Sequence, residues 1–286
     1  MEYLTHFFEE QPYPEEAKAF LLEAAAVLLD KPSSNAVIER YIDQYREGDI
    51  DFEAANQAVA EASKSVGISE YTGLLVFYIL LTEELAEKYR KRGISMDIYQ
   101  NTIQDLLYKA KECKAVHGVW GAFVASWFVG FYELTRFALG RLQFELSPLP
   151  IPYQKGDRLY PKGTLAINMH IPSSGPLTKE QCEDSFRQAL DFFAPESRLF
   201  MCDSWLLYPA HRQFLPSSSN ILMFMDFFDI ISQQEYPKQH DLWRIFGSKA
   251  QIPASQLPRD SGLQRAYADW IEAKNPVGSA LGVFER

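Results

Sequence analysis

Cysteine is scarce in this 286-residue chain, and its placement excludes two kinds of site. The three cysteines, Cys113, Cys182 and Cys202, form no C-x-x-C pair and leave an odd count. A disulfide framework needs paired cysteines in an oxidising compartment, and a structural zinc site needs closely spaced ligands. No basic segment followed by an apolar one opens the chain, so we expect no signal peptide. We therefore expect a cytoplasmic protein with no metal.

The nucleotide-binding and catalytic signatures that a sequence most readily displays are missing. The chain has no G-x-x-x-x-G-K-[ST], no G-x-G-x-x-G after a strand, no H-E-x-x-H and no calcium loop. Ser204 does not lie in a G-x-S-x-G elbow, and Cys202 beside it is expected to be a small buried side chain. Kinase, dinucleotide dehydrogenase and metalloprotease functions are therefore disfavoured.

Positive charge is also in short supply, since 28 Lys and Arg face 38 Asp and Glu, for a net charge of −10. This balance disfavours nucleic acid as a partner, because phosphate backbones are bound mainly by Lys and Arg. The deficit is uneven: residues 1–139 carry 13 basic and 22 acidic side chains, and residues 140–286 carry 15 and 16. The second half could therefore bind an anionic ligand without a large repulsive field.

Apolar residues are plentiful, at 47% of the chain with 14% aromatic, and in the first half they recur at helical spacing. Asp51 and Ser69 stand at helix starts, and Gly48, Gly67 and Gly93 stand at helix ends. These signals predict an all-α helical N-terminal domain over residues 1–139.

The most apolar segment has no Lys, Arg, Asp or Glu from Ala115 to Tyr132, which is near the length of a membrane span. Three glycines, a histidine, a serine and two tryptophans dilute its hydrophobicity. We therefore predict a central helix, buried by its neighbours, that continues to about Gly140, and no membrane association.

From Gly140 the pattern changes to strands and helices in mixed order. Period-2 alternation predicts strands in "RLQFEL" and "TLAINMHI", and "RLFMCDSWLL" is predicted as a strand buried on both faces. Helices are predicted in "KEQCEDSFRQALDFF", "SSSNILMFMDFFDII" and "GLQRAYADWIEAK", and further strands in "DLWRIFG" and "GSALGVFE". The whole chain is therefore predicted to be a two-part α+β protein, with the second domain over residues 140–286.

One loop stands between the second of these strands and the first helix. Thr178 and Gln181 form a T-x-x-Q capping box directly after "PSSGPL", so the helix start faces back toward the loop. Helix N-termini have unsatisfied N–H groups and a partial positive charge, which suit phosphate. The alternative is an ordinary turn whose donors are satisfied by Thr178 and Gln181 themselves.

Two polar strand faces form a second group of candidates. Arg141, Gln143 and Glu145 share the polar face of one strand, and Asn168 and His170 share the polar face of the other. If the two strands share a sheet, a carboxylate and an imidazole could meet and move a proton. The alternative is a solvated outer face, which such alternation often marks. Tyr208 and His211, after a later strand, are further candidates for a proton donor.

The segments "GRLQFE", "NMHIPSSGPLT", "CDSWLLYP", "SSSNILMF", "WRIFG", "GLQRAYADW" and "GSALGVFE" resemble a bacterial family of acyltransferase-domain proteins. That family pairs a helical N-terminal domain with a C-terminal domain similar to the GNAT N-acetyltransferases, whose mixed β-sheet is flanked by helices. The resemblance covers most of the chain and is strongest from Gly140 onward.

The resemblance implies acetyl-CoA or another acyl-CoA as co-substrate, held where two central strands separate. It places the pyrophosphate at the loop and helix start, so that the implied cofactor-binding residues are Ile171, Ser173, Ser174, Gly175, Leu177 and Thr178. One departure is that the usual Q/R-x-x-G-x-G/A loop is replaced by a single Gly175 followed by Pro176, which has no N–H.

The implied reaction is direct attack of a neutral amine on the thioester, with Glu145 or His170 as base and Tyr208 as donor to the thiolate. The acceptor would be a small-molecule or peptide amine. Two other functions stay open: a non-catalytic GNAT-like protein that binds a ligand or partner, and a self-associating scaffold, for which a homodimer is one form.

Overall fold

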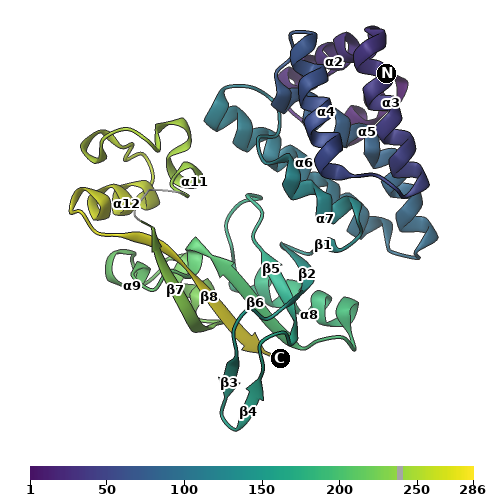
Figure 1. The fold of residues 1–286 in the computed structure, drawn as a ribbon. Helices are drawn as coiled ribbons and strands as arrows, with labels where there is room; N and C mark the ends of the chain where they lie inside the picture. Colours follow the sequence, from purple (N-terminus) through teal and green to yellow (C-terminus); the bar gives the residue numbers. More distant parts are fainter. Residues whose placement is uncertain (237–240) are drawn as a thin grey trace. The chain divides into compact units, whose positions relative to one another are not determined.

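The computed structural model describes residues 1–236 and 241–286. The chain folds into two compact units (Figure 1). The first unit spans Met1–Thr135 and the second Arg136–Arg286. The second unit begins four residues before Gly140, because Arg136–Leu139 is a strand of its sheet.

The first unit is built from helices. They are α1 (Glu2–Glu10), α2 (Glu15–Asp30), α3 (Pro32–Glu47), α4 (Phe52–Ser65), α5 (Glu70–Lys91), α6 (Met96–His117), the 3-10 turn η1 (Ala125–Phe128) and α7 (Val129–Tyr132). The core of this unit is α5, which is buried on nearly all sides from Thr72 to Thr82. Asp51 caps α4 by accepting from two backbone N–H groups, and Gly48 ends α3 in the left-handed conformation, as the sequence signals predict.

The predicted long helix after Ala115 is wrong, and its glycines explain why. Gly118 adopts a φ of +74° and ends α6. Gly121 passes so close to the backbone of Tyr71 that a Cβ there would lie 2.5 Å from its carbonyl carbon. The apolar run therefore divides into a loop, η1, α7 and β1. Within the two described ranges, no helix is long and apolar enough to cross a membrane.

The second unit is organised around a six-stranded mixed sheet with the order β1-β2-β5-β6-β8-β7. These strands are β1 (Arg136–Leu139), β2 (Leu142–Pro148), β5 (Leu165–His170), β6 (Leu199–Ser204), β8 (Val277–Glu285) and β7 (Asp229–Tyr236). A separate hairpin consists of β3 (Tyr153–Lys155) and β4 (Arg158–Tyr160). Within the described residues, β5 and β6 are the only parallel neighbours of this sheet.

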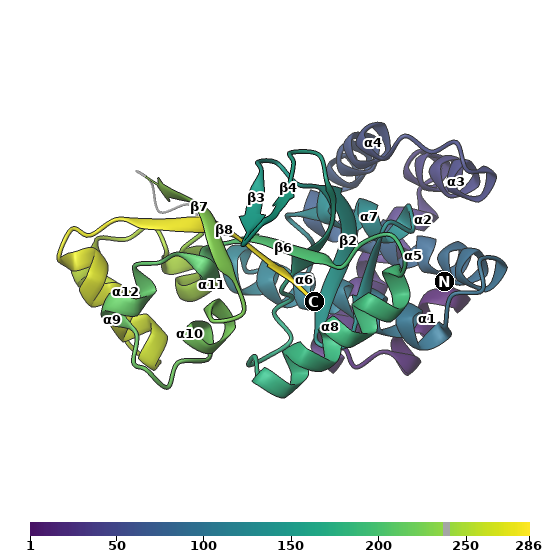
Figure 2. The same ribbon diagram turned by 90° about the horizontal axis from the view of Figure 1, so that it is seen from below.

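The helices of this unit are α8 (Lys179–Phe193), α9 (His211–Phe214), α10 (Asn220–Met225), α11 (Trp243–Phe246) and α12 (Gly262–Glu272), with 3-10 turns η2 (Trp205–Leu207), η3 (Gly247–Lys249) and η4 (Ala254–Gln256). Figure 2 shows α8 lying along the sheet. Phe186 of α8 packs on Phe200 of β6 and Phe284 of β8, whose rings stack with centroids 4.8 Å apart. Aromatic burial of this kind fixes α8 against the strands.

The α+β class predicted for the second domain is confirmed, but two of its predicted elements are wrong. The segment "DLWRIFG" contains helix α11 in place of a strand. The helix predicted in "SSSNILMFMDFFDII" is the short α10, and its last residues begin β7, which the sequence did not predict. Both segments are short apolar runs, for which helix and strand periodicities are hard to distinguish.

Candidate active site

The ends of several strands lie together along one side of the sheet. Because β5 and β6 are parallel, their carboxyl ends lie at the same edge, where β/α ligand sites usually form. Their pairing covers only Ile167 with Phe200 and Asn168 with Met201, so it stops before either strand ends. The start of β2 lies at this edge too, since it runs antiparallel to β5. The end of β7 and the start of β8 complete it.

Near this edge, Glu145 of β2 and His170 of β5 are brought into direct contact. Oε1 of Glu145 lies 2.7 Å from Nε2 of His170 and also accepts from Nδ2 of Asn168 at 3.2 Å. Because a carboxylate only accepts, Nε2 carries the hydrogen in a neutral imidazole, and Nδ1 holds the ring's lone pair. The arrangement resembles the carboxylate–imidazole pair of general-base catalysis, in which the carboxylate orients the ring.

Arg136 of β1 completes this cluster from the other side. Its Nε and Nη2 donate to Oε2 of Glu145 at 3.0 and 2.9 Å. Burial raises the pKa of Glu145, but the hydrogen bond from His170 and the charge of Arg136 outweigh burial and lower that pKa to about 2. Glu145 is therefore an ionised, orienting group at neutral pH rather than a strong base.

The predicted phosphate loop lies between β5 and α8. Ser173, Ser174 and Gly175 are exposed, whereas the side chain of Leu177 is only 6% exposed and could offer a ligand only its backbone. Ile171 and Thr178 are half-buried. Gly175 has a φ of +115°, a conformation that a residue with a side chain rarely adopts.

The N-terminus of α8 is only partly capped. Thr178 Oγ1 accepts from the N–H of Gln181 at 3.2 Å, which is one of the two bonds of the predicted capping box. Intrahelical bonding leaves the first N–H groups of any helix without partners, and here these are the amides of Lys179 and Glu180. Such amides can bind an anion.

The side chain of Arg141 binds the backbone carbonyl groups of the same loop. The guanidinium donates to the carbonyl oxygens of Pro172 at 3.0 Å, of Pro176 at 3.4 Å and of Gly175. It thereby fixes the loop against the start of β2 and places a positive charge beside it. In the sequence, Arg141 belongs to a polar strand face, but no local pattern indicates this role, which depends on the folding of the loop.

Tyr208 contacts β7 and β8. It follows β6, its hydroxyl donates to Oε1 of Glu235 on β7 at 3.1 Å, and it is 4% exposed. Burial, together with the neighbouring carboxylate of Glu235, raises the pKa of Tyr208 to about 12. The ring packs on Gly278, where a Cβ would lie 2.8 Å from it.

His211 is fully buried and uncharged, because burial lowers its pKa to about 4. Its Nδ1 lies 3.3 Å from the carbonyl oxygen of Leu206, and its Nε2 bonds the hydroxyl of Tyr267. The role of His211 is therefore to hold the hydroxyl of Tyr267, and its ring is not accessible for proton exchange with solvent.

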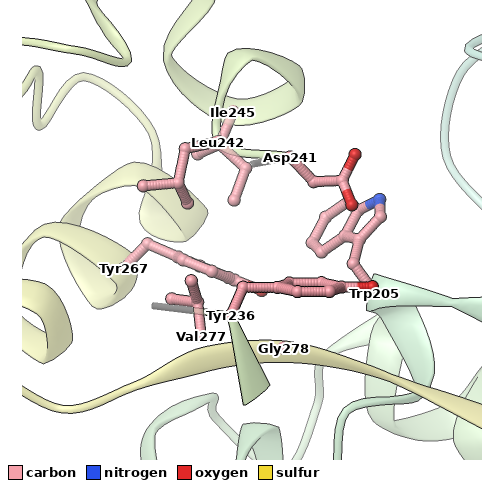
Figure 3. Close-up of a pocket in the computed structure, with 8 residues that line it drawn as sticks. All are labelled: Trp205, Tyr236, Asp241, Leu242, Ile245, Tyr267, Val277 and Gly278. Carbon is pink, nitrogen blue, oxygen red and sulfur yellow. The ribbon is translucent and has the colours of Figure 1, made fainter. Parts of the chain in front are cut away.

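Tyr267 lines a small hollow beside the end of β7 and the start of β8, with space for about one water molecule (Figure 3). The rings of Trp205, Tyr236 and Tyr267 form its aromatic walls. The hydroxyl of Tyr236 bonds Ser279 Oγ at 2.7 Å, which fixes that ring.

The remaining lining comes from the segment between β7 and β8 and from the start of β8. Leu242, Ile245 and Val277 make it apolar, Gly278 forms part of its floor, and Asp241 is its one charged residue among those described. No alternation or motif marks these residues in the sequence, so the hollow was not predicted. Within residues 1–236 and 241–286, no group of three His, Cys, Asp or Glu side chains could hold a metal ion.

These features define a GNAT-like domain after a helical unit, and comparison with known families agrees. Residues 136–284 match the model of the GNAT-like C-terminal domain, and residues 2–134 match the N-acyltransferase N-terminal domain. The chain therefore belongs to the family with this GNAT-like C-terminal domain, as the resemblance indicated.

Solved structures share the fold at low identity. An acyltransferase in complex with decanoyl-CoA is 19% identical with a TM-score of 0.78, over 99% of this chain and 87% of that one. An acyltransferase in complex with decanoyl-CoA and teicoplanin is 20% identical with a TM-score of 0.77, over 100% and 88%. A search of curated proteins finds no match to the sequence.

Proposed function

We propose that the protein transfers an acyl group from an acyl-CoA to an amine, with the reaction at the carboxyl edge of β5 and β6. The observation that carries the proposal is the Glu145–His170 contact of 2.7 Å, a few residues before the loop and helix start that suit a diphosphate. Family membership and the acyl-CoA ligands of the similar structures support the same reaction.

The acyl donor would lie with its pyrophosphate at the loop. Backbone groups of Ile171, Ser173, Ser174, Gly175, Leu177 and Thr178, and the first amides of α8, would hold it. Pro176 offers no donor, so the positive charge of Arg141 would compensate for the missing loop amide.

In the reaction, the amine lone pair attacks the thioester carbonyl carbon, and a C–N bond forms as the C–S bond breaks. His170 Nδ1 takes the proton that the amine loses, while Glu145 stabilises the imidazolium that results. The sulfur leaves as a thiolate and acquires a proton, for which Tyr208 is the proposed donor. With a pKa of about 12, Tyr208 keeps its proton at neutral pH but is a weaker acid than a thiol of pKa about 8.5, so we assign it a smaller share of the rate than His170.

Because similar structures hold decanoyl-CoA and teicoplanin, medium-chain donors and peptide-like amines are the first substrates to try. The direct test measures thiol release from decanoyl-CoA in the presence of a panel of amines. We expect turnover in the wild type and a loss of about 100-fold or more in His170→Ala, since general-base catalysis contributes about 10² to 10⁴. We expect a loss of about tenfold or less in Tyr208→Phe.

The matched control is His6→Ala, which removes an exposed imidazole from the first unit and should leave turnover unchanged. Equal rates in His170→Ala and His6→Ala would rule out His170 as the base. Binding of decanoyl-CoA without thiol release, with every amine tried, would favour the non-catalytic alternative.

A further inference from the structure

Asp203 on β6 lies in register with His170 on the neighbouring strand β5. The two strands are parallel, and their last paired positions are Asn168 and Met201. Side chains at paired positions point to the same face of a sheet, and so do side chains two residues apart on one strand. His170 and Asp203 each lie two residues beyond this pair, so their side chains share one face at the carboxyl edge of the two strands.

The pairing of β6 with β8 on its other side gives Asp203 the same orientation. Met201 pairs with Val283, and Asp203 pairs with Leu281. Met201, Val283 and Leu281 belong to one core cluster, so they lie on the same face of the sheet. Along β6, this face is buried at Leu199 and Met201 and becomes exposed at Asp203.

The carboxylate of Asp203 differs from the other carboxylates of the sheet. Within residues 1–236 and 241–286, its side chain takes part in no hydrogen bond and no ion pair. The other acidic residues of the described strands each have a donor in the same unit, and they are Glu145, Asp229, Glu235 and Glu285. An exposed carboxylate with no protein partner can pair with a cation that a ligand brings.

The charges at this edge are arranged by sign. On the β5 side, Arg141 donates to the loop that precedes α8, where the anionic coenzyme is proposed to bind. On the β6 side, Asp203 offers a negative charge. An alkylamine has a pKa close to that of a lysine side chain, about 10.4, so it is an ammonium ion at neutral pH. The two substrates of the proposed reaction would therefore each meet a charge of opposite sign.

The spacing of the strands suits a nitrogen between the two side chains. Neighbouring strands lie about 5 Å apart, so a nitrogen between Asp203 and His170 could lie about 3 Å from an atom of each. The imidazole is held from the opposite side, because Glu145 belongs to β2 and β5 lies between β2 and β6. Since Asp203 is exposed, such binding requires no enclosed cavity.

We propose that Asp203 binds the ammonium group of the acceptor amine and positions its nitrogen beside His170. The inference rests on the proposed function, because it concerns the acceptor of that reaction, but binding of the ammonium ion itself requires no acyl donor. Release of one proton to solvent then gives the neutral amine that attacks the thioester. The competing interpretation is a solvated carboxylate that binds no ligand.

The first experiment uses the full chain without coenzyme and compares benzylammonium with its neutral counterpart, benzyl alcohol, in ligand-detected NMR titrations. We expect the ammonium ion to bind about fivefold more tightly than the alcohol, as one exposed ion pair allows. Asp203→Asn should abolish this preference, whereas Asp203→Glu, which keeps the charge, should retain it.

The matched control is Asp226→Asn, which removes the same charge from an exposed residue paired with Arg212 elsewhere in the unit and should leave the preference intact. Equal affinity of the wild type for the ammonium ion and the alcohol would overturn the proposal. A preference that survives in Asp203→Asn would do the same. An equal loss in Asp203→Asn and Asp203→Glu would indicate a structural role and also contradict the proposal.

The second experiment separates binding from proton transfer by measuring thiol release from decanoyl-CoA at varied benzylamine concentration. We expect Asp203→Asn to raise KM for benzylamine about fivefold and to leave kcat within about twofold of the wild type. His170→Ala should lower kcat instead. A fall in kcat with an unchanged KM in Asp203→Asn would contradict the assignment of Asp203 to amine binding.

The two proposals fail in different ways. If benzylammonium binding depends on the charge of Asp203 but no amine supports thiol release, the ammonium site stands and the acyltransferase activity does not. If thiol release occurs but Asp203→Asn changes neither the NMR preference nor KM, only the ammonium site is contradicted.

Discussion

The environment of Glu145 allows a specific prediction of how the stability of the fold depends on pH. Its pKa of about 2 lies below the value of about 4.3 expected in an unfolded chain, so the folded state binds its proton less readily. A depressed pKa contributes stability that is fully present above the unfolded value and is lost as pH falls toward the folded value. The stability that ionised Glu145 contributes is therefore lost as the pH falls from about 4.5 to about 2.

We expect Glu145→Gln to be less stable than the wild type by about 2–3 kcal/mol at pH 6, because Arg136 and His170 lose a charged partner. The difference should shrink when both are compared at pH 3. Denaturant midpoints at the two pH values measure it. Glu196→Gln, at an exposed position of the same unit, serves as control, and a Glu145→Gln deficit that stays constant with pH would refute the assignment.

The sequence predicted part of this cluster and missed part of it. Alternation put Glu145 and His170 on polar faces, and the pairing of β2 with β5 joins them. Arg136 was hidden, because it lies at the end of an apolar run that predicts helix. Which strand lies beside β2 is a long-range property that no local pattern contains.

At the scale of elements, the loop between β5 and α8 depends on the conformation of one glycine. Gly175 has open space around it, so Gly175→Ala would be opposed by its φ of +115° alone, at about 1–3 kcal/mol of backbone strain. We expect the loop to change conformation and the affinity for decanoyl-CoA to fall about tenfold, measured by calorimetry.

Gly156→Ala is the matched control, since Gly156 also has a positive φ and open space but lies in the hairpin turn between β3 and β4. If both variants bind decanoyl-CoA as the wild type does, the loop does not hold the coenzyme.

A second element-scale prediction concerns the start of β8. Gly278→Ala would place a Cβ 2.2 Å from the carbonyl oxygen of Gln234 and 2.8 Å from the ring of Tyr208, so β7 and Tyr208 must shift. We expect a destabilisation of more than about 2 kcal/mol.

Gly262→Ala is the natural comparison, because its nearest contact is 4.0 Å away and it lies at the start of helix α12. Alanine favours a helix over glycine by up to about 1 kcal/mol, so this variant should be as stable as the wild type or more so. Equal melting temperatures for Gly278→Ala and Gly262→Ala would contradict this account of the packing at Gly278.

The predictability of elements follows how local their signals are. The N-caps of helices α4, α8 and α12 are Asp51, Thr178 and Ser261, and each side chain accepts a hydrogen bond from the first turn of its helix. Such capping residues can be recognised in the sequence. Strand β7 was not predictable, because it is polar, mostly exposed and formed only by pairing with β8 some forty residues later. The hollow at its end was missed for the same reason.

At the scale of the whole molecule, the charge is divided between the units. Met1–Thr135 holds 12 basic and 22 acidic side chains, whereas Arg136–Arg286 holds 16 of each. The unit with the proposed coenzyme site is therefore neutral overall, so an anionic acyl-CoA meets no net repulsion from it.

The most direct measurement of the central claim is a crystal structure of the protein with bound decanoyl-CoA. The account predicts that the pyrophosphate lies about 3 Å from the amides of Lys179 and Glu180, next to Arg141, with the thioester carbonyl facing His170. A coenzyme bound elsewhere, with the α8 N-terminus covered by side chains of the protein, would contradict it.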